Sequence, residues 1–106
     1  MRNILQDLPD NRDAEVFENI VDEEGVRVER IVSHGQSSPV SGWYDQDWHE
    51  WVTVLEGEAV VAFANGEDAH LKAGDHLMIP ARCQHRVKWT HPARPTVWLA
   101  VHYPKA

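Results

Sequence analysis

The chain has 106 residues, of which 42% are hydrophobic and 25% are charged, and its formal net charge is −7 at pH 7. These totals predict one folded domain over residues 1–106 and argue against an intrinsically disordered chain. Because the balance is acidic and no run of lysine or arginine offsets it, we expect no binding to nucleic acid or to anionic membrane surfaces.

Two features of the sequence bear on its compartment. The single cysteine, Cys83, has no partner for an internal disulfide, which fits a reducing environment. No apolar run approaches the roughly 20 residues that span a bilayer, and the first residues lack the apolar segment of a signal peptide. We therefore expect a cytoplasmic protein.

Short apolar runs, separated by turn residues, follow one another along the chain. In chain order the candidate strands are 16–21, 26–33, 51–55, 59–63, 70–72, 76–79, 85–90 and 96–102. A loop rich in serine, proline and glycine covers 35–42, and the pair Asn65-Gly66 is a strong hairpin signal. Residues 1–14 are compatible with a helical turn or a strand. About eight or nine short strands with regular turns predict an all-β sandwich or barrel.

Alternation along the strands predicts which side chains face the interior of such a barrel. Two stripes each begin with an ionisable group and continue with apolar side chains. The stripes are Glu50, Val52 and Val54, and His85, Val87 and Trp89. A carboxylate and an imidazole at the ends of apolar stripes predict a site at the mouth of an apolar pocket, with Trp89 as an aromatic wall.

Two motifs in the sequence carry a family resemblance. In GDHLMIPARCQH, Pro80 follows Gly74 by six residues and His85 follows Pro80 by five. In EWVTVLEGE, Glu50 lies seven residues before Gly57. With this spacing the chain resembles the small single-domain members of the cupin superfamily. The resemblance implies a double-stranded β-helix, or jelly-roll, barrel of about eight or nine short antiparallel strands.

The sequence departs from the cupin pattern at four positions. The family has histidines six and four residues before the motif glutamate, where this chain has Tyr44 and Gln46. It usually has glycine where this chain has Arg82, and often asparagine where this chain has Trp89. The first motif is therefore incomplete, and the second is nearly whole.

The resemblance implies a metal site that has lost some of the family's ligands. In cupins that bind metal, the two histidines and glutamate of the first motif join the histidine of the second, and here only Glu50 and His85 carry over. Gln46 is the candidate third ligand through its amide oxygen, and the metal expected is a divalent transition ion such as Zn, Fe, Mn or Ni. Tyr44 and Trp89 are expected to contact a bound cofactor or ligand.

Other histidines and tryptophans are weaker candidates for the site. His49 faces away from Glu50 on a regular strand, but it is an alternative third ligand where the strand is irregular. Trp51 and Trp98 are expected in core or dimer packing. The remaining histidines expected at the surface are His34, His70, His91 and His102.

Three functions remain open on these residues, and the sequence does not decide whether the protein is an enzyme. The first is a metal-dependent enzyme acting on a small organic substrate, with Glu50 as ligand or base and His85 as ligand. The second is a metal-free isomerase or lyase in which Glu50 and His85 exchange protons with the substrate. The third is a non-catalytic module that binds or senses a small molecule. The resemblance also implies a homodimer.

Overall fold

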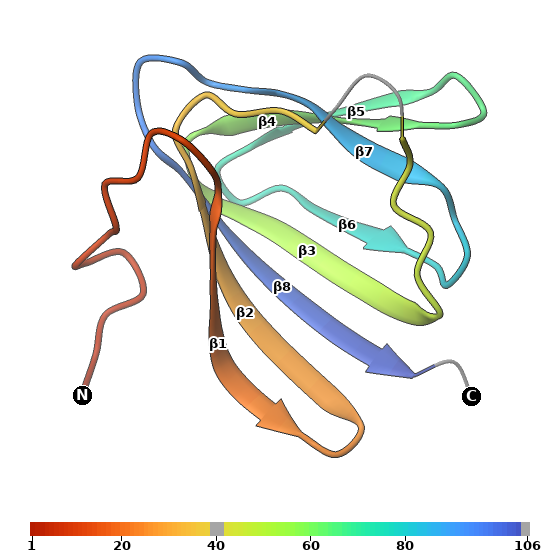
Figure 1. Cartoon of the computed structure of the whole chain (residues 1–106), viewed down its shortest axis with the longest axis horizontal. Coiled ribbons are helices and arrows are strands. Elements are labelled where there is room, and N and C mark those ends of the chain that lie inside the picture. The colour runs from red at the N-terminus through yellow and green to blue at the C-terminus, as the bar shows by residue number, and fades with distance from the viewer. Residues whose placement is uncertain (39–41, 105–106) are drawn as a thin grey trace.

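The computed structural model describes residues 1–38 and 42–104, which hold eight antiparallel strands in two sheets (Figure 1). The strands are β1 (Val16–Glu23), β2 (Val26–Ser33), β3 (Trp48–Glu56), β4 (Glu58–Phe63), β5 (Asp68–Lys72), β6 (His76–Ile79), β7 (His85–Thr90) and β8 (Thr96–Pro104). The order is β1-β2-β8-β3-β6 in the larger sheet and β5-β4-β7 in the smaller. The predicted all-β architecture is therefore confirmed.

The predicted elements agree closely with the observed strands. The bounds of β2, β6 and β7 are those predicted, and β3 and β8 extend further than their apolar runs. Residues 1–14 form turns and bends, and the predicted loop 35–42 includes residues 39–41, which lie outside the described residues. Within the described ranges no helix is long and apolar enough to cross a membrane.

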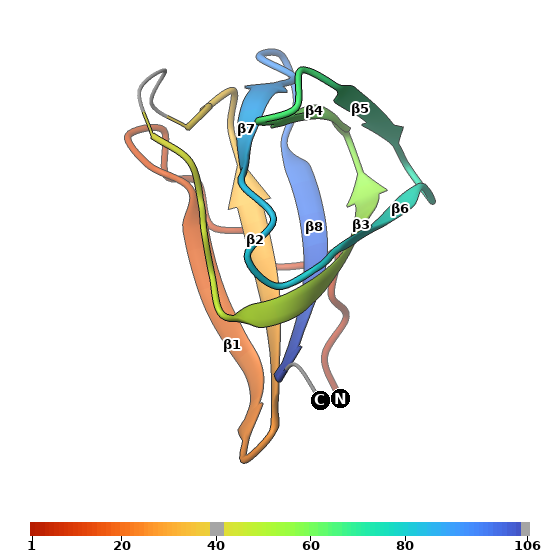
Figure 2. The same ribbon diagram turned by 90° about the vertical axis from the view of Figure 1, so that its right-hand side faces the viewer.

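The two sheets lie face to face and are joined along both sides (Figure 2). On one side, the turn after β5 meets β3, where Gly74 N donates to Val54 O at 2.7 Å. On the other, the segment after β2 runs beside β7, where Ser38 N donates to Val87 O at 2.8 Å and Tyr44 N donates to His85 O at 2.7 Å. These contacts hold the loop that precedes β3 against the first half of β7.

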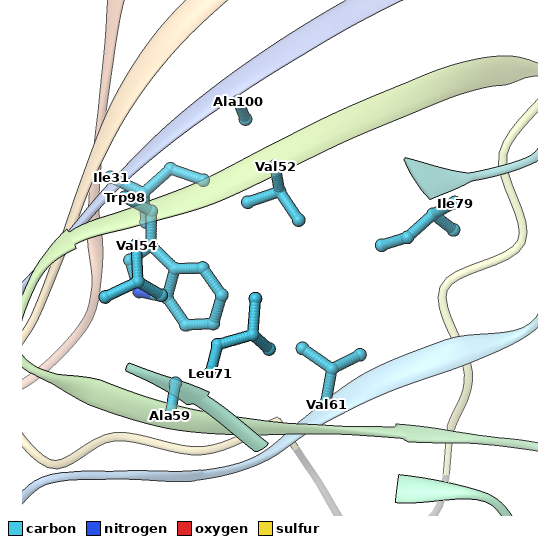
Figure 3. Packing of buried hydrophobic residues seen from close by; sticks show 9 residues of the cluster. All are labelled: Ile31, Val52, Val54, Ala59, Val61, Leu71, Ile79, Trp98 and Ala100. Carbon is cyan, nitrogen blue, oxygen red and sulfur yellow. The ribbon is translucent and has the colours of Figure 1, made fainter. Parts of the chain in front are cut away.

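Apolar side chains from both sheets fill the space between them (Figure 3). The buried cluster comprises Ile31, Val52, Val54, Ala59, Val61, Leu71, Ile79, Trp98 and Ala100. Trp98 is 3% exposed, and its indole nitrogen donates to Ser33 Oγ at 3.1 Å. Burial of each large apolar side chain contributes about 1.5–3 kcal/mol to the free energy of unfolding. Trp98 is thus a core residue as predicted, whereas Trp51 is half-buried outside this cluster and donates to His76 Nδ1 at 3.3 Å.

Candidate functional site

The register of the larger sheet places ionisable residues side by side at one end of the interior. Arg27 on β2 pairs with His102 on β8, which pairs in turn with Glu50 on β3. Because side chains alternate, every second residue along these strands faces the same side. The next rows on that side are Glu29, Ala100 and Val52, and then Ile31, Trp98 and Val54. The interior is therefore polar at one end and apolar further along.

His85, the first residue of β7, reaches this polar end from the smaller sheet. The residue is 5% exposed, and its Nδ1 lies 2.9 Å from the carbonyl oxygen of Cys83. Because a carbonyl oxygen only accepts hydrogen bonds, Nδ1 carries the proton in this contact. Nε2 then faces Glu50, at 3.6 Å from Oε1. The Cys83 carbonyl thus orients the imidazole toward the carboxylate.

Glu50 is buried and is held from two sides. It is 9% exposed, and its Oε1 accepts a hydrogen bond from Gln46 Nε2 at 3.0 Å. Burial opposes its charge, but the ionic contact with His85, the hydrogen bond from Gln46 and the nearby charge of His102 outweigh that effect and hold the pKa of Glu50 below its usual value. Burial likewise opposes charge on His85, but the ionic contact with Glu50 and the hydrogen bond to the Cys83 carbonyl raise the pKa of this imidazole. The arrangement favours a carboxylate facing an imidazolium.

Arg82 fixes the loop that carries Gln46. Arg82 has a positive φ of 66°, a conformation that suits the glycine usual at this place in the cupin pattern. Its backbone nitrogen donates to Gln46 O at 2.7 Å, and its guanidinium pairs with Asp45 at 3.1 Å and Asp47 at 2.9 Å. These contacts hold the loop before β3 against the loop before β7, with the Gln46 amide on Glu50.

The opposite pKa shifts of Glu50 and His85 predict how stability depends on pH. The contribution of Glu50, whose folded pKa is lowered, is lost as pH falls through that pKa. The contribution of His85, whose folded pKa is raised, is complete below its unfolded value of 6.5 and is lost as pH rises through the folded pKa. Urea denaturation should therefore show Glu50→Gln less stable than the wild type by about 2 kcal/mol, with the largest difference between pH 4.5 and 6.5.

The matched control for that experiment is Glu56→Gln, which changes an exposed carboxylate at the end of the same strand. It should leave the free energy of unfolding within about 0.5 kcal/mol of the wild type at every pH. If the free energy of unfolding changed with pH in the same way for the wild type and Glu50→Gln, the interaction between Glu50 and His85 would not contribute to stability.

His102 is a further residue of the polar end, and its predicted surface position is wrong. It is 6% exposed, and its Nε2 lies 2.8 Å from Glu29 Oε1 and 3.9 Å from Glu50 Oε2. Arg27 Nε lies 3.9 Å from Glu29 Oε1. Alternation along β8 could have predicted the inward position of His102, because it lies four residues after Trp98, the predicted core residue, and so faces the same side of the strand. The positions of Glu29 and Arg27 could not be predicted without the pairing of β2 with β8.

A cavity of about 230 Å³ opens between these groups and the apolar core. Its polar lining comes from Glu15, Arg27, Glu29, Tyr44, Gln46, Glu50, His85 and His102, and its apolar lining from Phe17, Ile31, Val52, Val61, Ile79, Val87 and Trp98. Four predicted site residues, Tyr44, Gln46, Glu50 and His85, thus come together in one cavity. Glu15 is set apart from them, because its carboxyl accepts a hydrogen bond from Ser33, and burial raises its pKa.

Two other candidates lie outside this cavity. The predicted inward orientation of Trp89 is wrong, because the pairing of β4 with β7 shifts by one residue, with Val61 opposite Val87 but Val60 opposite Trp89. This β-bulge reverses the facing beyond Val87, and the Trp89 ring instead contacts the rings of two surface histidines. His49 faces away from the cavity, as alternation predicts, and its Nδ1 accepts a hydrogen bond from Ala81 N at 2.9 Å.

The donor set at this end does not fit a metal ion well. Over residues 1–38 and 42–104 no three His, Cys, Asp or Glu side chains are arranged to hold one. A carboxylate only accepts hydrogen bonds, so the contact with Glu50 uses the NH₂ group of Gln46 and turns its amide oxygen away. The nearest further imidazole, His102, is hydrogen-bonded to Glu29. The metal site predicted at Gln46, Glu50 and His85 stays a prediction.

Comparisons with known proteins identify a matching family and several similar structures. A family model described as "Cupin domain" matches residues 28–102. A crystal structure of a "putative mannose-6-phosphate isomerase" from Ralstonia eutropha JMP134 is 40% identical, covers 99% of this chain and 98% of that chain, and has a TM-score of 0.94. The structure of TT1209 from Thermus thermophilus is 21% identical, covers 100% of this chain and 98% of that chain, and has a TM-score of 0.82, which concerns the fold alone.

One curated relative matches over a shorter segment. The uncharacterized protein YdbB of Bacillus subtilis (strain 168) is 42% identical over 50 residues. That segment is 42% of this chain and 44% of YdbB, so the match spans less than half of the relative's length.

Proposed function

This chain belongs to the cupin domain family, and we propose that its cavity catalyses metal-free proton transfer on a small carbonyl compound, as an isomerase or lyase. The observation that carries the proposal is the buried pair of Glu50 and His85, whose facing atoms are 3.6 Å apart in a largely apolar cavity. Their opposite pKa shifts keep Glu50 ionised and His85 protonated before the reaction, which are the forms that a base and an acid require, although the lowered pKa makes Glu50 a weaker base than one tuned toward neutral pH.

In the proposed mechanism, each residue moves one proton. Glu50 accepts the proton from the carbon next to the substrate carbonyl, and His85 donates its Nε2 proton to the carbonyl oxygen, which leaves an enediol or enol. Glu50 then returns the proton to the former carbonyl carbon, and the hydroxyl on the carbon that lost the proton gives its own proton back to His85. The carbonyl has moved to the neighbouring carbon, and neither residue is changed. Gln46 and the Cys83 carbonyl hold the two groups in place.

The Ralstonia eutropha relative supports an isomerisation of this kind. That protein is named a "putative mannose-6-phosphate isomerase", and an isomerisation of this sugar phosphate moves a carbonyl between neighbouring carbons through proton transfer. At 40% identity over almost the whole chain, a shared class of reaction is a reasonable hypothesis. The substrate is a separate question, because one fold serves many substrates.

Hydrogen exchange at carbon tests the proposed step directly. The purified protein would be incubated in D₂O with small α-hydroxy aldehydes and ketones, and deuterium at the carbon next to the carbonyl would be followed by NMR. Glu50→Gln and His85→Gln should each slow wild-type exchange by at least about 100-fold, the usual contribution of a positioned acid or base. Glu56→Gln, which changes an exposed carboxylate on the same strand, should leave it unchanged.

Two results of that experiment would count against the proposal. Wild-type exchange no faster than in buffer, for every compound tested, would leave a non-catalytic binding or sensor module as the better description. Exchange that persists in both variants would place the reacting groups elsewhere in the molecule.

A metal-dependent enzyme is the other candidate, because cupin folds often bind metals. It requires Glu50 and His85 as ligands, with Gln46 rotated so that its amide oxygen faces inward. Elemental analysis of protein purified without added metal, beside Glu50→Gln and His85→Ala, tests this version. Near-stoichiometric metal in the wild type, lost in both variants, would favour it over metal-free chemistry.

A further inference from the structure

Beyond the polar end of the cavity, where Glu50 and His85 lie with Arg27, Glu29, Tyr44, Gln46 and His102, the wall is mainly apolar. The apolar residues that form it are Phe17, Ile31, Val52, Val61, Ile79, Val87 and Trp98, contributed by both sheets. Figure 3 shows five of these side chains converging in the interior. One further ionisable group, Glu15, lines the cavity away from the polar end, and its carboxyl is already hydrogen-bonded to Ser33. A ligand that enters therefore meets hydrogen-bonding groups mainly at one end.

This wall is unsuited to a polyhydroxylated ligand. A sugar carries a hydroxyl on nearly every carbon, and each hydroxyl that is buried without a partner costs about 1–3 kcal/mol. Each hydroxyl left without a partner would therefore weaken binding by about that amount. An apolar body in the same position would instead contribute about 25 cal/mol for each Å² that it removes from water.

The charges around the cavity are equally unsuited to a phosphate ester. Arg27 is the one permanently cationic residue of the lining, and its Nε lies 3.9 Å from the carboxylate of Glu29. Three carboxyl groups, those of Glu15, Glu29 and Glu50, line the same cavity. Phosphate sites in proteins use several converging cations or backbone N–H groups, and this cavity has no such set within the described residues.

We infer that the ligand is an uncharged molecule with an apolar ring or chain as its body and one carbonyl-bearing polar end. The polar end lies beside the facing atoms of Glu50 and His85, and the body lies against Val61 and Trp98. For the role of the carbonyl this inference rests on the proposed function. The cavity of about 230 Å³ is smaller than the roughly 300–1,000 Å³ of pockets for larger ligands, which suits a single ring with a short side chain.

The test compares two ligands that share the reacting group and differ in the body. 2-Hydroxyacetophenone is an uncharged α-hydroxy ketone on an aromatic ring, and mannose 6-phosphate is a charged, polyhydroxylated α-hydroxy aldehyde. Titration calorimetry of each against the full chain should give at least about 10-fold tighter binding of 2-hydroxyacetophenone. Equal or tighter binding of mannose 6-phosphate, or no binding of 2-hydroxyacetophenone, would overturn the inference.

Matched substitutions on β4 locate the binding. Val61 is 2% exposed and lines the cavity, whereas Val60, its neighbour in sequence, faces the other side of the sheet and is partly exposed. Val61→Phe should fill the cavity and weaken 2-hydroxyacetophenone binding at least about 10-fold, and Val60→Phe should leave it unchanged. Val87→Thr, which keeps the volume and adds a hydroxyl, should weaken binding several-fold without filling the cavity. Equal binding by all three variants would place the ligand outside the cavity and overturn the inference.

Deuterium exchange on the same two compounds separates this inference from the proposed function. Binding of 2-hydroxyacetophenone without exchange would support the ligand class and contradict the catalytic role of Glu50 and His85. Exchange on mannose 6-phosphate, without binding of 2-hydroxyacetophenone, would support the catalytic role and contradict the ligand class.

Discussion

The double variant Tyr44→His, Gln46→His is expected to bind Zn²⁺ at least about 100-fold more tightly than the wild-type chain. Both positions line the cavity beside Glu50 and His85, and they are the positions where the cupin pattern has histidine. Loss of even an outer partner of a metal ligand costs about 10–100-fold in affinity, so two added imidazoles should have at least that effect. Competition against a chromophoric chelator gives the dissociation constants, and Co²⁺ absorption reports the ligand geometry.

The control for this variant is Tyr44→Phe, Gln46→Leu, which changes the same positions without adding a ligand. It should bind Zn²⁺ no better than the wild type. Adding Glu50→Gln to the histidine variant should weaken the new site again, because the carboxylate is then missing. A wild-type chain that already binds Zn²⁺ as tightly as the double variant would show that the amide of Gln46 is an adequate ligand and that the metal-free proposal is wrong.

Most of the fold could be predicted from local patterns in the sequence. Strands β2, β6 and β7 begin and end where their apolar runs do. Local signals also mark turns and breaks, because β6 ends just before Pro80 and the Asn65-Gly66 pair lies between β4 and β5. The inward positions of Glu50 and Val52 follow from alternation on β3, which has no irregularity at that end. These features depend on residues near in sequence, and sequence patterns report such features well.

The rest of the candidate site depends on pairing between distant strands. The facing predicted for Trp89 is wrong because a one-residue bulge in β7 reverses the facing of every later residue, and no residue type in that strand announces the bulge. The approach of Glu29 to His102 requires the register between β2 and β8, which are 73 residues apart at this contact. Arg82 stands out in the sequence as a departure from the family's glycine, but its role in holding Gln46 requires the neighbouring loop in place.

Gly57→Ala is expected to destabilise the fold by about 2–5 kcal/mol, the sum of a backbone cost and a packing cost. Gly57 joins β3 to β4 with a φ of 93°, and a left-handed backbone costs a residue with a Cβ about 1–2 kcal/mol. A Cβ at this position would also lie 2.6 Å from Thr96 Cα and 2.7 Å from Pro95 O, both backbone atoms. Overpacking against atoms that cannot rotate away adds about 1–3 kcal/mol. Urea denaturation followed by circular dichroism measures the sum.

Gly66→Ala separates the two contributions. Gly66 lies in the turn between β4 and β5 with a φ of 94°, and a Cβ there would meet no atom within 4 Å. It should therefore cost about 1–2 kcal/mol from backbone strain alone. The difference between the variants then measures the contact of the β3–β4 turn with the start of β8, the strand that carries His102 to Glu50. If Gly57→Ala costs no more than Gly66→Ala, that contact can relax freely, and the alignment of β3 with β8 does not depend on it.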